Sequence, residues 1–457
     1  MTQTTLPLEE ERATLSPLSK LSLPKDKDLP PIIREVVTNA PANRKVPAFV
    51  ACLSPLCALS TRVRLNYYYD TRPSALLLQV IIQGAQSSGK SFAADIESLI
   101  MNNTLKEHDR NMRRQEQEYR ELKKRRKANE KLDEEPQTTI RVVPATISKT
   151  VLTKRADMFQ RIHGDTLSFW MFAEELAQVT DAGKAGYSNL RTIMRTAYDL
   201  GSLFGLDFAS DNSYSAIVDI NVCSMFCATP AAVDEYFDKK AIEGGNITRC
   251  ILCPLDESIG EDGAIFTPYT PQQHKVIADT LQQLMAATYT ADGLLQPTIN
   301  LDMSWLDKTV CHWCKTKGLE ASKNGNIALD VFRKRSSVSA FRVAALCYYL
   351  YKLDKTDEQV AQKRARQIYL YMAEYILESL LNRWGKRFMK ANNQREQENQ
   401  PEARPQLFDA LPDVFTREQL RLQISNQGLV TSERNFIYVW KKQKLIELID
   451  KNTFKKR

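Results

Sequence analysis

The sequence lacks any apolar run long enough to span a membrane. A membrane-spanning helix takes about 20 predominantly apolar residues, and the longest runs here are the much shorter "ALLLQVII" and "VAALCYYLY". The first twenty residues are polar, contain three glutamates and include no apolar segment of the kind that a secretory signal has. These absences favour a cytoplasmic protein without membrane contact, and we expect residues 1–28 to form a disordered tail.

Histidine and cysteine are also scarce. Four histidines and nine cysteines in 457 residues do not make a disulfide scaffold and leave few ligands for a metal. Cys250 with Cys253, and Cys311 with Cys314, have the spacing of zinc-binding pairs, and a shared four-thiolate site is one interpretation. The surrounding sequence favours packing instead, because "RCILCPL" is typical of a strand and "SWLDKTVCHWCKTKG" of a helix.

Positive charge is in excess, and it is concentrated in two segments. The net charge is +8. Residues 106–131 contain eleven basic and six acidic residues, and residues 416–457 contain ten and four, which leaves a net charge of −3 for the remainder. This distribution indicates a polyanionic partner such as DNA.

The segment "GAQSSGKS" fits the phosphate-binding pattern G-x-x-x-x-G-K-[ST] without a mismatch. Gly84 and Gly89 allow backbone conformations that point successive N–H groups at one anion. Lys90 would contact the β- and γ-phosphates, and the Ser91 hydroxyl would bind Mg²⁺. The residues expected to bind ATP are Gly84, Ala85, Gln86, Ser87, Ser88, Gly89, Lys90, Ser91 and Phe92.

The sequence around this pattern is that of a strand, a loop and a helix. Residues 76–82 form a short aliphatic run typical of a strand buried on both faces of a parallel sheet. After the loop, "SFAADIESLIM" has apolar residues at helical spacing. The alternative is a glycine-rich turn with a coincidental lysine, which does not account for this context.

A second buried strand is expected at residues 167–173, and it ends at Glu174 and Glu175. We assign Glu174 to the Mg²⁺ and Glu175 to the attacking water. Aspartate is the usual first acid, so the division of labour between the two glutamates stays open. The alternative is a solvated helix start, where glutamate is also favoured.

Two further residues are candidates for contact with the nucleotide. The apolar run "INVCSMFCATP" ends at Thr229, which would sense the γ-phosphate from between the other two strands or serve only the strand end. Arg249 follows a glycine pair at the start of "RCILCPL". An arginine there would neutralise transition-state charge at the nucleotide of its own or a neighbouring subunit.

Residues 104–137 are rich in helix formers and predict a long exposed helical arm that ends near Pro136. The arm contains "KKRRK", which would contact a DNA backbone. The alternative is a solvated helix held by ion pairs between successive turns. The candidate DNA contacts of the arm are Lys123, Lys124, Arg125 and Arg126.

The last residues predict a winged helix, consisting of a helix, a turn, a second helix and a basic hairpin. Thr416 with Gln419 forms a capping box, while Ile437, Trp440 and Leu445 would face the core. The opposite face of the second helix would enter the major groove of DNA, although many winged helices bind protein instead. Its candidate DNA contacts are Arg434, Tyr438, Lys441 and Lys442.

These patterns predict an α/β protein whose sheet is parallel. The expected parts are a lead-in segment at 29–74, an ATPase core at 75–265, a helical region at 266–388, a linker at 389–410 and the winged helix at 411–457. Within the helical region, Arg342 interrupts an otherwise apolar helix and is a candidate for a further anion contact.

Taken together, "GAQSSGKS", "FAEEL", "YSNLRTIMRTAYD", "CATP", "GNITRC" and "FRVAALCYYLY" resemble a primase-helicase-like P-loop family of unassigned function from plasmids, phages and conjugative elements. The resemblance covers residues 30–385. It implies a RecA-like core and a homo-oligomer, such as a hexameric ring, that hydrolyses ATP with Mg²⁺ and acts on DNA. It also implies that any priming would come from a separate primase or other protein of the mobile element.

Two functions from different classes fit these features. The first is an ATP-dependent DNA motor or remodelling ATPase that is helicase-like. The second is a nucleotide-switched DNA-binding regulator or assembly protein that hydrolyses little ATP and unwinds nothing. Both require the same loop and the same basic tail, so the sequence does not separate them.

Overall fold

The structure is a computed structural model of the chain. It describes residues 22–68, 70–125, 135–184, 190–206, 214–238, 241–242, 245–256, 265–390, 404–426, 432–442 and 445–456. By the density of internal contacts the chain divides into two compact units, Met1–Phe388 and Met389–Arg457. Most of the predicted tail and of the predicted linker lies outside the described residues.

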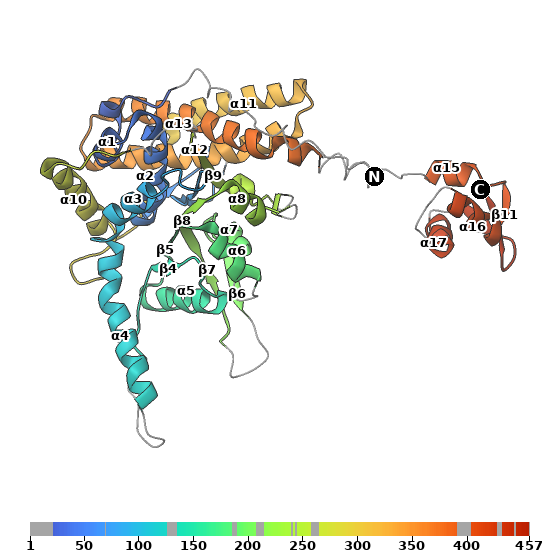
Figure 1. Cartoon of the computed structure of the whole chain (residues 1–457), viewed down its shortest axis with the longest axis horizontal. Coiled ribbons are helices and arrows are strands. Elements are labelled where there is room, and N and C mark those ends of the chain that lie inside the picture. The colour runs from blue at the N-terminus through green and yellow to red at the C-terminus, as the bar shows by residue number, and fades with distance from the viewer. Residues whose placement is uncertain are drawn as a thin grey trace, which may run out of the picture. The chain divides into compact units, whose positions relative to one another are not determined.

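The larger unit is an α/β structure built on a five-stranded parallel sheet (Figure 1). The strand order is β4-β5-β8-β3-β9, and every neighbouring pair in it is parallel. The strands are β3 Gln79–Gln83, β4 Val142–Pro144, β5 Ser168–Ala173, β8 Asn221–Ala228 and β9 Cys250–Pro254. All eight residues of β8 are buried, as expected for a parallel sheet that is covered on both faces. The predicted α/β class and parallel sheet are therefore confirmed.

Helices surround this sheet. They are α1 Pro31–Thr38, α2 Lys45–Leu59, α3 Phe92–Met101, α4 Leu105–Arg125, α5 Lys149–His163, α6 Leu176–Lys184, α7 Leu190–Thr196, α8 Pro230–Tyr236, α10 Pro271–Ala286, α11 Asp307–Lys323, α12 Ile327–Leu353 and α13 Glu358–Leu380. α2 is buried almost along its whole length and packs across β3, β5, β8 and β9. Small additional sheets are formed by β1 Val63–Leu65, β2 Ser74–Ala75 and β10 Ile299–Asn300, and by β6 Leu203–Leu206 with β7 Ala216–Asp219.

Arg342 connects the helical region at 266–388 to segments beside the central sheet. This arginine of α12 is only 3% exposed. Its guanidinium donates to the carbonyl oxygens of Leu77 at 3.0 Å and Tyr198 at 2.9 Å, and it lies 4.2 Å from the centre of the Tyr198 ring. The arginine therefore joins α12 to the segment before β3 and to the segment after α7. It is a structural residue of the core and not a surface anion contact.

The described residues of the smaller unit form three helices and a three-stranded antiparallel sheet. Its elements are α15 Arg404–Asp409, β11 Val414–Thr416, α16 Arg417–Asn426, α17 Glu433–Lys442, β12 Ile446–Leu448 and β13 Thr453–Lys456, with strand order β11-β13-β12. The capping box forms, because Gln419 N donates to Thr416 Oγ1 at 3.3 Å and Thr416 N donates to Gln419 Oε1 at 2.8 Å. α15 lies inside the predicted linker, and its Leu407 is part of the buried core of this unit.

The residues predicted to face the core of the smaller unit are buried in the structure, with one exception. Ile437 and Trp440 are buried together with Leu420, Phe415 and Phe454. Leu445, in contrast, is 39% exposed, so the prediction that it faces the core is wrong. It lies just after α17 and just before β12, where the helical spacing on which the prediction was based no longer applies.

Neither a membrane helix nor a metal cluster is found in the described part of the chain. No helix there combines the length and the hydropathy that a membrane crossing needs. No group of three or more His, Cys, Asp or Glu side chains is arranged there for metal binding. All nine cysteines are free, and Cys250 and Cys253 are buried in β9. Cys250 and Cys253 therefore pack within the buried part of β9, as the packing interpretation predicts for this pair.

Candidate functional site

The predicted phosphate-binding segment is a tight loop between the carboxyl end of β3 and the start of α3. Ser87 and Gly89 have φ angles of 61° and 72°, in the region that L-residues rarely adopt. At Gly84 a Cβ atom would lie 2.3 Å from Ser88 Oγ, so a larger residue there would displace Ser88. The loop therefore needs glycine at Gly84 for close packing and at Gly89 for backbone conformation.

The side chain of Lys90 folds back over this loop. Its Nζ atom lies 3.0 Å from the carbonyl oxygen of Gly84 and 3.3 Å from Ser88 Oγ, and it also contacts the carbonyl oxygen of Ala85. The ammonium group is thus held where the loop turns. Ser91 precedes α3, and its side chain makes no capping hydrogen bond with the helix. The first turn of α3 adds the positive end of the helix dipole, while the N–H groups of Ala93 and Ala94 donate to the carbonyl oxygens of Lys90 and Ser91.

Neighbouring segments hold the loop in place. Gly84 N donates to the carbonyl oxygen of Ala228 at the end of β8, at 3.0 Å. Arg44, which is 5% exposed, donates from one guanidinium to the carbonyl oxygens of Ser88 at 3.1 Å and of Asp256 at 3.2 Å. Sequence reasoning missed Arg44, because no local pattern signals a contact between residues 44 positions apart.

The carboxylates of Glu174 and Glu175 follow β5 at the same edge of the sheet. Ala173 of β5 and Ile81 of β3 both align with Phe226 of β8. The two glutamates therefore continue β5 at the level where β3 runs into the loop, and both are exposed. β8 lies between β5 and β3, so the two strands are separated by about 10 Å, which is twice the usual spacing of strands.

Two charged groups of the candidate site shift the pKa of a buried thiol at this edge of the sheet. Burial raises the pKa of Cys227 to about 12, while Lys90 acts to lower it and Glu174 acts to raise it. Cys227 belongs to β8, the strand between the loop strand and the acidic strand. The Lys90 ammonium and the Glu174 carboxylate are therefore both close enough to the end of β8 to act on one thiol.

The loop helix and the acidic strand are connected directly through Glu97 of α3. Its carboxylate accepts a hydrogen bond from Trp170 Nε1 of β5 at 3.0 Å, and Lys106 Nζ lies 2.6 Å from its other oxygen. Glu97 is only 2% exposed. Sequence reasoning missed this contact as well, although a tryptophan in a strand buried on both faces needs an acceptor for its N–H group.

Thr229 lies at the end of β8, between the loop strand and the acidic strand. Its hydroxyl oxygen accepts a hydrogen bond from Ala232 N at 3.2 Å and thereby caps α8. Thr229 thus has an evident role at the strand end. Contact with a γ-phosphate stays a prediction.

Arg249 lies at the opposite end of the strands from the phosphate loop. It directly precedes Cys250 of β9, which pairs with Gln79 at the amino end of β3, whereas the phosphate loop follows the carboxyl end of that strand. The strand of five residues between these ends spans about 16 Å. Arg249 is therefore remote from the loop of its own chain, and a role at the nucleotide of a neighbouring copy stays a prediction.

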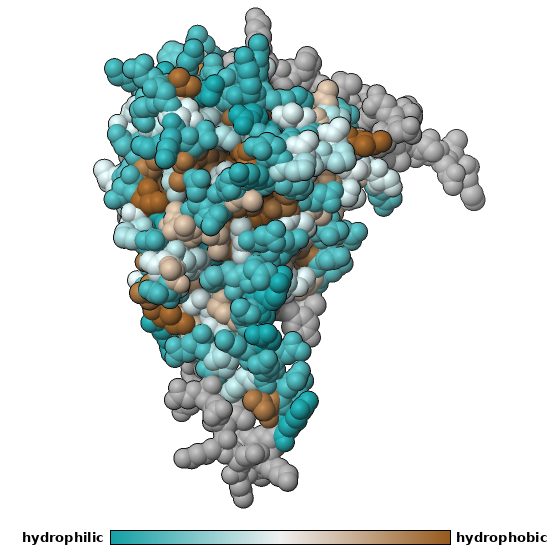
Figure 2. Space-filling view, turned by 90° about the vertical axis from the view of Figure 1, so that its left-hand side faces the viewer, coloured by the Kyte–Doolittle hydropathy of each residue, from teal (hydrophilic) through white to brown (hydrophobic). Residues whose placement is uncertain are grey.

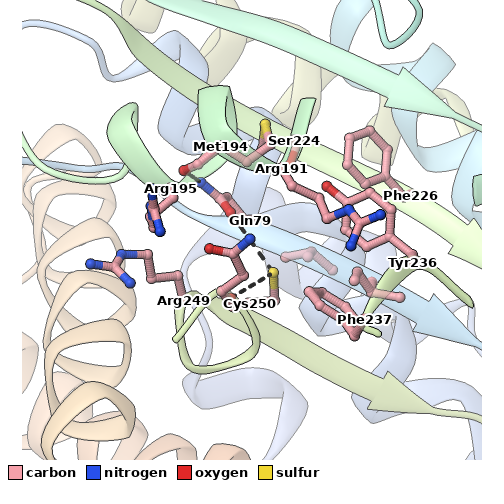
Figure 3. A pocket seen from close by; sticks show the side chains of 13 residues that line it. Gln79, Arg191, Met194, Arg195, Ser224, Phe226, Tyr236, Phe237, Arg249 and Cys250 are labelled. Carbon is pink, nitrogen blue, oxygen red and sulfur yellow. Dashed lines mark hydrogen bonds between the residues drawn. The ribbon is translucent and has the colours of Figure 1, made fainter. Parts of the chain in front are cut away.

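The surroundings of Arg249 are basic and tightly packed (Figure 3). Burial lowers the pKa of Arg249, and the nearby Arg335 lowers it further. Arg249 and Arg335 both lie within 6 Å of the Tyr198 ring, as does Arg342. The cavity beside Arg249 has a free volume of about 10 Å³, which holds about one water molecule and no larger ligand.

The candidate DNA contacts on α4 are exposed. Lys123, Lys124 and Arg125 form the end of the helix, while Arg126 lies outside the described residues. Arg125 lies 3.9 Å from Glu121, and similar pairs join Arg120 to Glu116 and Arg114 to Glu118. The interpretation of the arm as a solvated helix held by ion pairs therefore agrees with its described part. Figure 2 shows the face on which α4 lies, and its surface is mainly hydrophilic.

The candidate DNA contacts of the smaller unit lie on α17. Arg434 and Lys441 are exposed, Tyr438 is 67% exposed, and Lys442 ends the helix. Trp440 and Ile437 are buried on the other side of the same helix. α17 therefore presents a basic and aromatic surface opposite its core-facing residues.

Comparisons with known proteins yield structural similarity only. No family model matches the chain, and no curated protein matches it either. Among solved structures, one match is a protein described as "SCCmec type IV Cch - active helicase", at 11% sequence identity and a TM-score of 0.27. The match covers 88% of this chain and 66% of that helicase, so the chain spans less than two thirds of its length. A TM-score of this size does not establish a common fold.

Proposed function

We propose that this chain is an ATPase of the P-loop type with a RecA-like core, which acts on DNA as a motor or remodeller. One observation carries the proposal. A glycine-dependent loop with a lysine folded over it and an exposed pair of carboxylates meet at one edge of a parallel sheet, on strands separated by one strand. This is the arrangement that binding and hydrolysis of a nucleoside triphosphate require.

Each residue at this edge has a physical task in that reaction. Backbone N–H groups of the loop residues 86–91 and the positive end of the α3 dipole would surround the phosphates. Lys90 exchanges its contacts with the Gly84 and Ala85 carbonyl oxygens for phosphate oxygens. The hydroxyl of Ser91 and a carboxylate oxygen of Glu174 are suitable ligands for Mg²⁺, which when bound neutralises charge on the phosphates.

Glu175 is the residue proposed to orient the attacking water and to accept its proton. Glu175 follows a strand that is hydrogen-bonded to α3 through Trp170 and Glu97, which supports this proposal. Thr229, between the two strands, is proposed to contact the γ-phosphate with its hydroxyl hydrogen while its oxygen continues to cap α8.

The remaining proposed features involve other molecules. Arg249 is proposed to act on the nucleotide of a neighbouring copy in a homo-oligomer, because it is too far from its own loop. The smaller unit is proposed to be a winged helix that binds DNA through Arg434, Tyr438 and Lys441 of α17. Its helix, helix and hairpin order and its antiparallel sheet support this proposal.

The test is the rate of ATP hydrolysis with and without single- and double-stranded DNA, with the oligomer mass measured in the same samples. Lys90→Ala is expected to abolish hydrolysis while duplex binding by the smaller unit persists. Undiminished turnover in Lys90→Ala would refute the site. DNA-stimulated turnover with strand displacement would support a motor, whereas slow turnover with ATP-dependent assembly on duplex DNA would support the alternative of a nucleotide-switched assembly protein.

A further inference from the structure

A cleft of about 340 Å³ lies between α4 and α5, outside the proposed nucleotide site. Residues 116, 119, 120 and 123 of α4 line it, and so do residues 151, 154, 155 and 158 of α5. In both helices these positions are separated by three, four and seven residues, so each helix turns one continuous face to the cleft. Glu135, Pro136 and Thr138 line its remaining side, and the volume is in the range of small-ligand sites.

The lining of the cleft combines apolar and cationic groups. Tyr119, Pro136 and Met158 provide an apolar surface, and each of them is partly exposed. Four cations and two carboxylates also line the cleft, which gives a surplus of two positive charges. A ligand that fits such a lining has a flat apolar part and an anionic part.

Both carboxylates are already bound by cations. Arg155 holds Glu116 through two hydrogen bonds of 3.1 and 3.2 Å, and Lys154 lies 2.7 Å from Glu135. Burial acts to raise the pKa of Glu116, but hydrogen bonds from Arg155 and Thr138 bring it below its ordinary value. Glu116 is therefore ionised, and its charge is compensated within the lining.

The positive surplus lies on the α4 side of the cleft. Arg120 is exposed and contacts Glu116, which Arg155 already neutralises. Lys123 is exposed one turn further along the same face, and no ion pair of Lys123 is formed with the described residues. Lys124 carries the same charge on the next position of the helix but does not line the cleft.

We propose that this cleft binds one nucleotide unit of a single nucleic-acid strand, with the base on Tyr119 and the phosphate at Lys123 and Arg120. Aromatic stacking together with a cationic track is the general mode of single-strand binding. In a duplex the bases are stacked inside and would not reach a concave site. The inference rests on the proposed action on DNA, adds a contact at the basic end of α4 that the sequence predicts, and does not depend on ATP hydrolysis.

The test uses the full chain and a labelled oligothymidylate of roughly eight nucleotides, with binding followed by fluorescence anisotropy. Tyr119→Ala is expected to weaken binding about tenfold, because a base loses its stacking partner, while Tyr119→Phe keeps the ring and stays close to the unchanged protein. Lys123→Glu is expected to weaken binding and to flatten its salt dependence, and the matched variant Lys124→Glu is expected to do so much less.

Three results would overturn the inference. The first is unchanged oligothymidylate binding by Tyr119→Ala, and the second is an equal loss of affinity in Lys123→Glu and Lys124→Glu. The third is binding of thymidine monophosphate as tight as that of the oligomer, which would assign the cleft to a free nucleotide. Duplex binding and DNA-independent ATP hydrolysis are measured on the two Tyr119 variants and are expected to be unchanged. If Lys90→Ala loses hydrolysis while Tyr119→Ala binds oligothymidylate as tightly as the unchanged protein, the proposed function stands and only this inference fails.

Discussion

Replacing Arg44 tests how strongly residues around the phosphate loop determine the affinity of the loop for a nucleotide. The Arg44 guanidinium connects the carbonyl oxygen of Ser88 in the loop to that of Asp256 beyond β9. Arg44→Met keeps an apolar stem of similar length and removes both hydrogen bonds. A net contribution of about 1 kcal/mol for each bond gives a loss of about 2 kcal/mol, which corresponds to about 30-fold weaker nucleotide binding if the loop then leaves its binding conformation.

The assay is calorimetric titration of Mg·ADP into the full chain, accompanied by a thermal melt. Arg44→Lys is expected to bind with intermediate affinity, because an ammonium is a point charge without the planar fork that reaches two carbonyl oxygens at once. Lys45→Met is the matched control, since the neighbouring Lys45 pairs with Asp26 and makes no recorded contact with the loop. Wild-type affinity in Arg44→Met, or an equal loss in Lys45→Met, would contradict the positioning role of Arg44.

Three further predictions concern other parts of the chain. Asp109→Ala removes the acceptor of the buried Arg141 N–H and of the part-buried Val142 N–H, and it is expected to reduce the free energy of unfolding by about 3 kcal/mol in a denaturant titration. Replacement of the exposed Glu118 by Ala is expected to change this free energy little. Cys227, with a pKa near 12, stays protonated at neutral pH, so a thiol reagent is expected to label it only after unfolding; rapid labelling of the native protein would contradict its burial. Removal of residues 416–457 is expected to weaken DNA binding and flatten its salt dependence, and an unchanged salt slope would exclude the smaller unit as the DNA-binding part.

The loop and its strand were predictable from sequence because their signals are local. Gly84 and Gly89 are required by the loop itself, through close approach in one case and a positive φ angle in the other. The aliphatic run before them is continuous because a parallel strand is buried on both faces. The same reasoning located the strand before Glu174 and Glu175 and the capping box at Thr416.

Features that depend on pairing between distant segments were not predictable in this way. Arg249 follows a glycine pair that suggested close approach to the nucleotide, but the parallel register of β9 with β3 places it at the other edge of the sheet. Arg342 looked like an anomaly in an apolar helix, whereas its partners are backbone carbonyl oxygens more than 140 residues away. Leu445 was assigned to the core from helical spacing that ends before it.

The placement of Arg249 also restricts how copies of this chain could share a nucleotide site. The phosphate loop follows the carboxyl end of β3, and Arg249 lies beside its amino end, so the two groups belong to opposite edges of one sheet. In an isologous dimer both copies use the same patch, so Arg249 would reach the partner's loop only if that patch includes both ends of β3. A head-to-tail interface needs no such patch, because it joins the arginine end of one copy to the loop end of the next, and it closes into a ring or continues as a filament. An unchanged hydrolysis rate in an assembled Arg249→Ala variant would exclude Arg249 from catalysis while leaving the loop and its carboxylates as the site of hydrolysis.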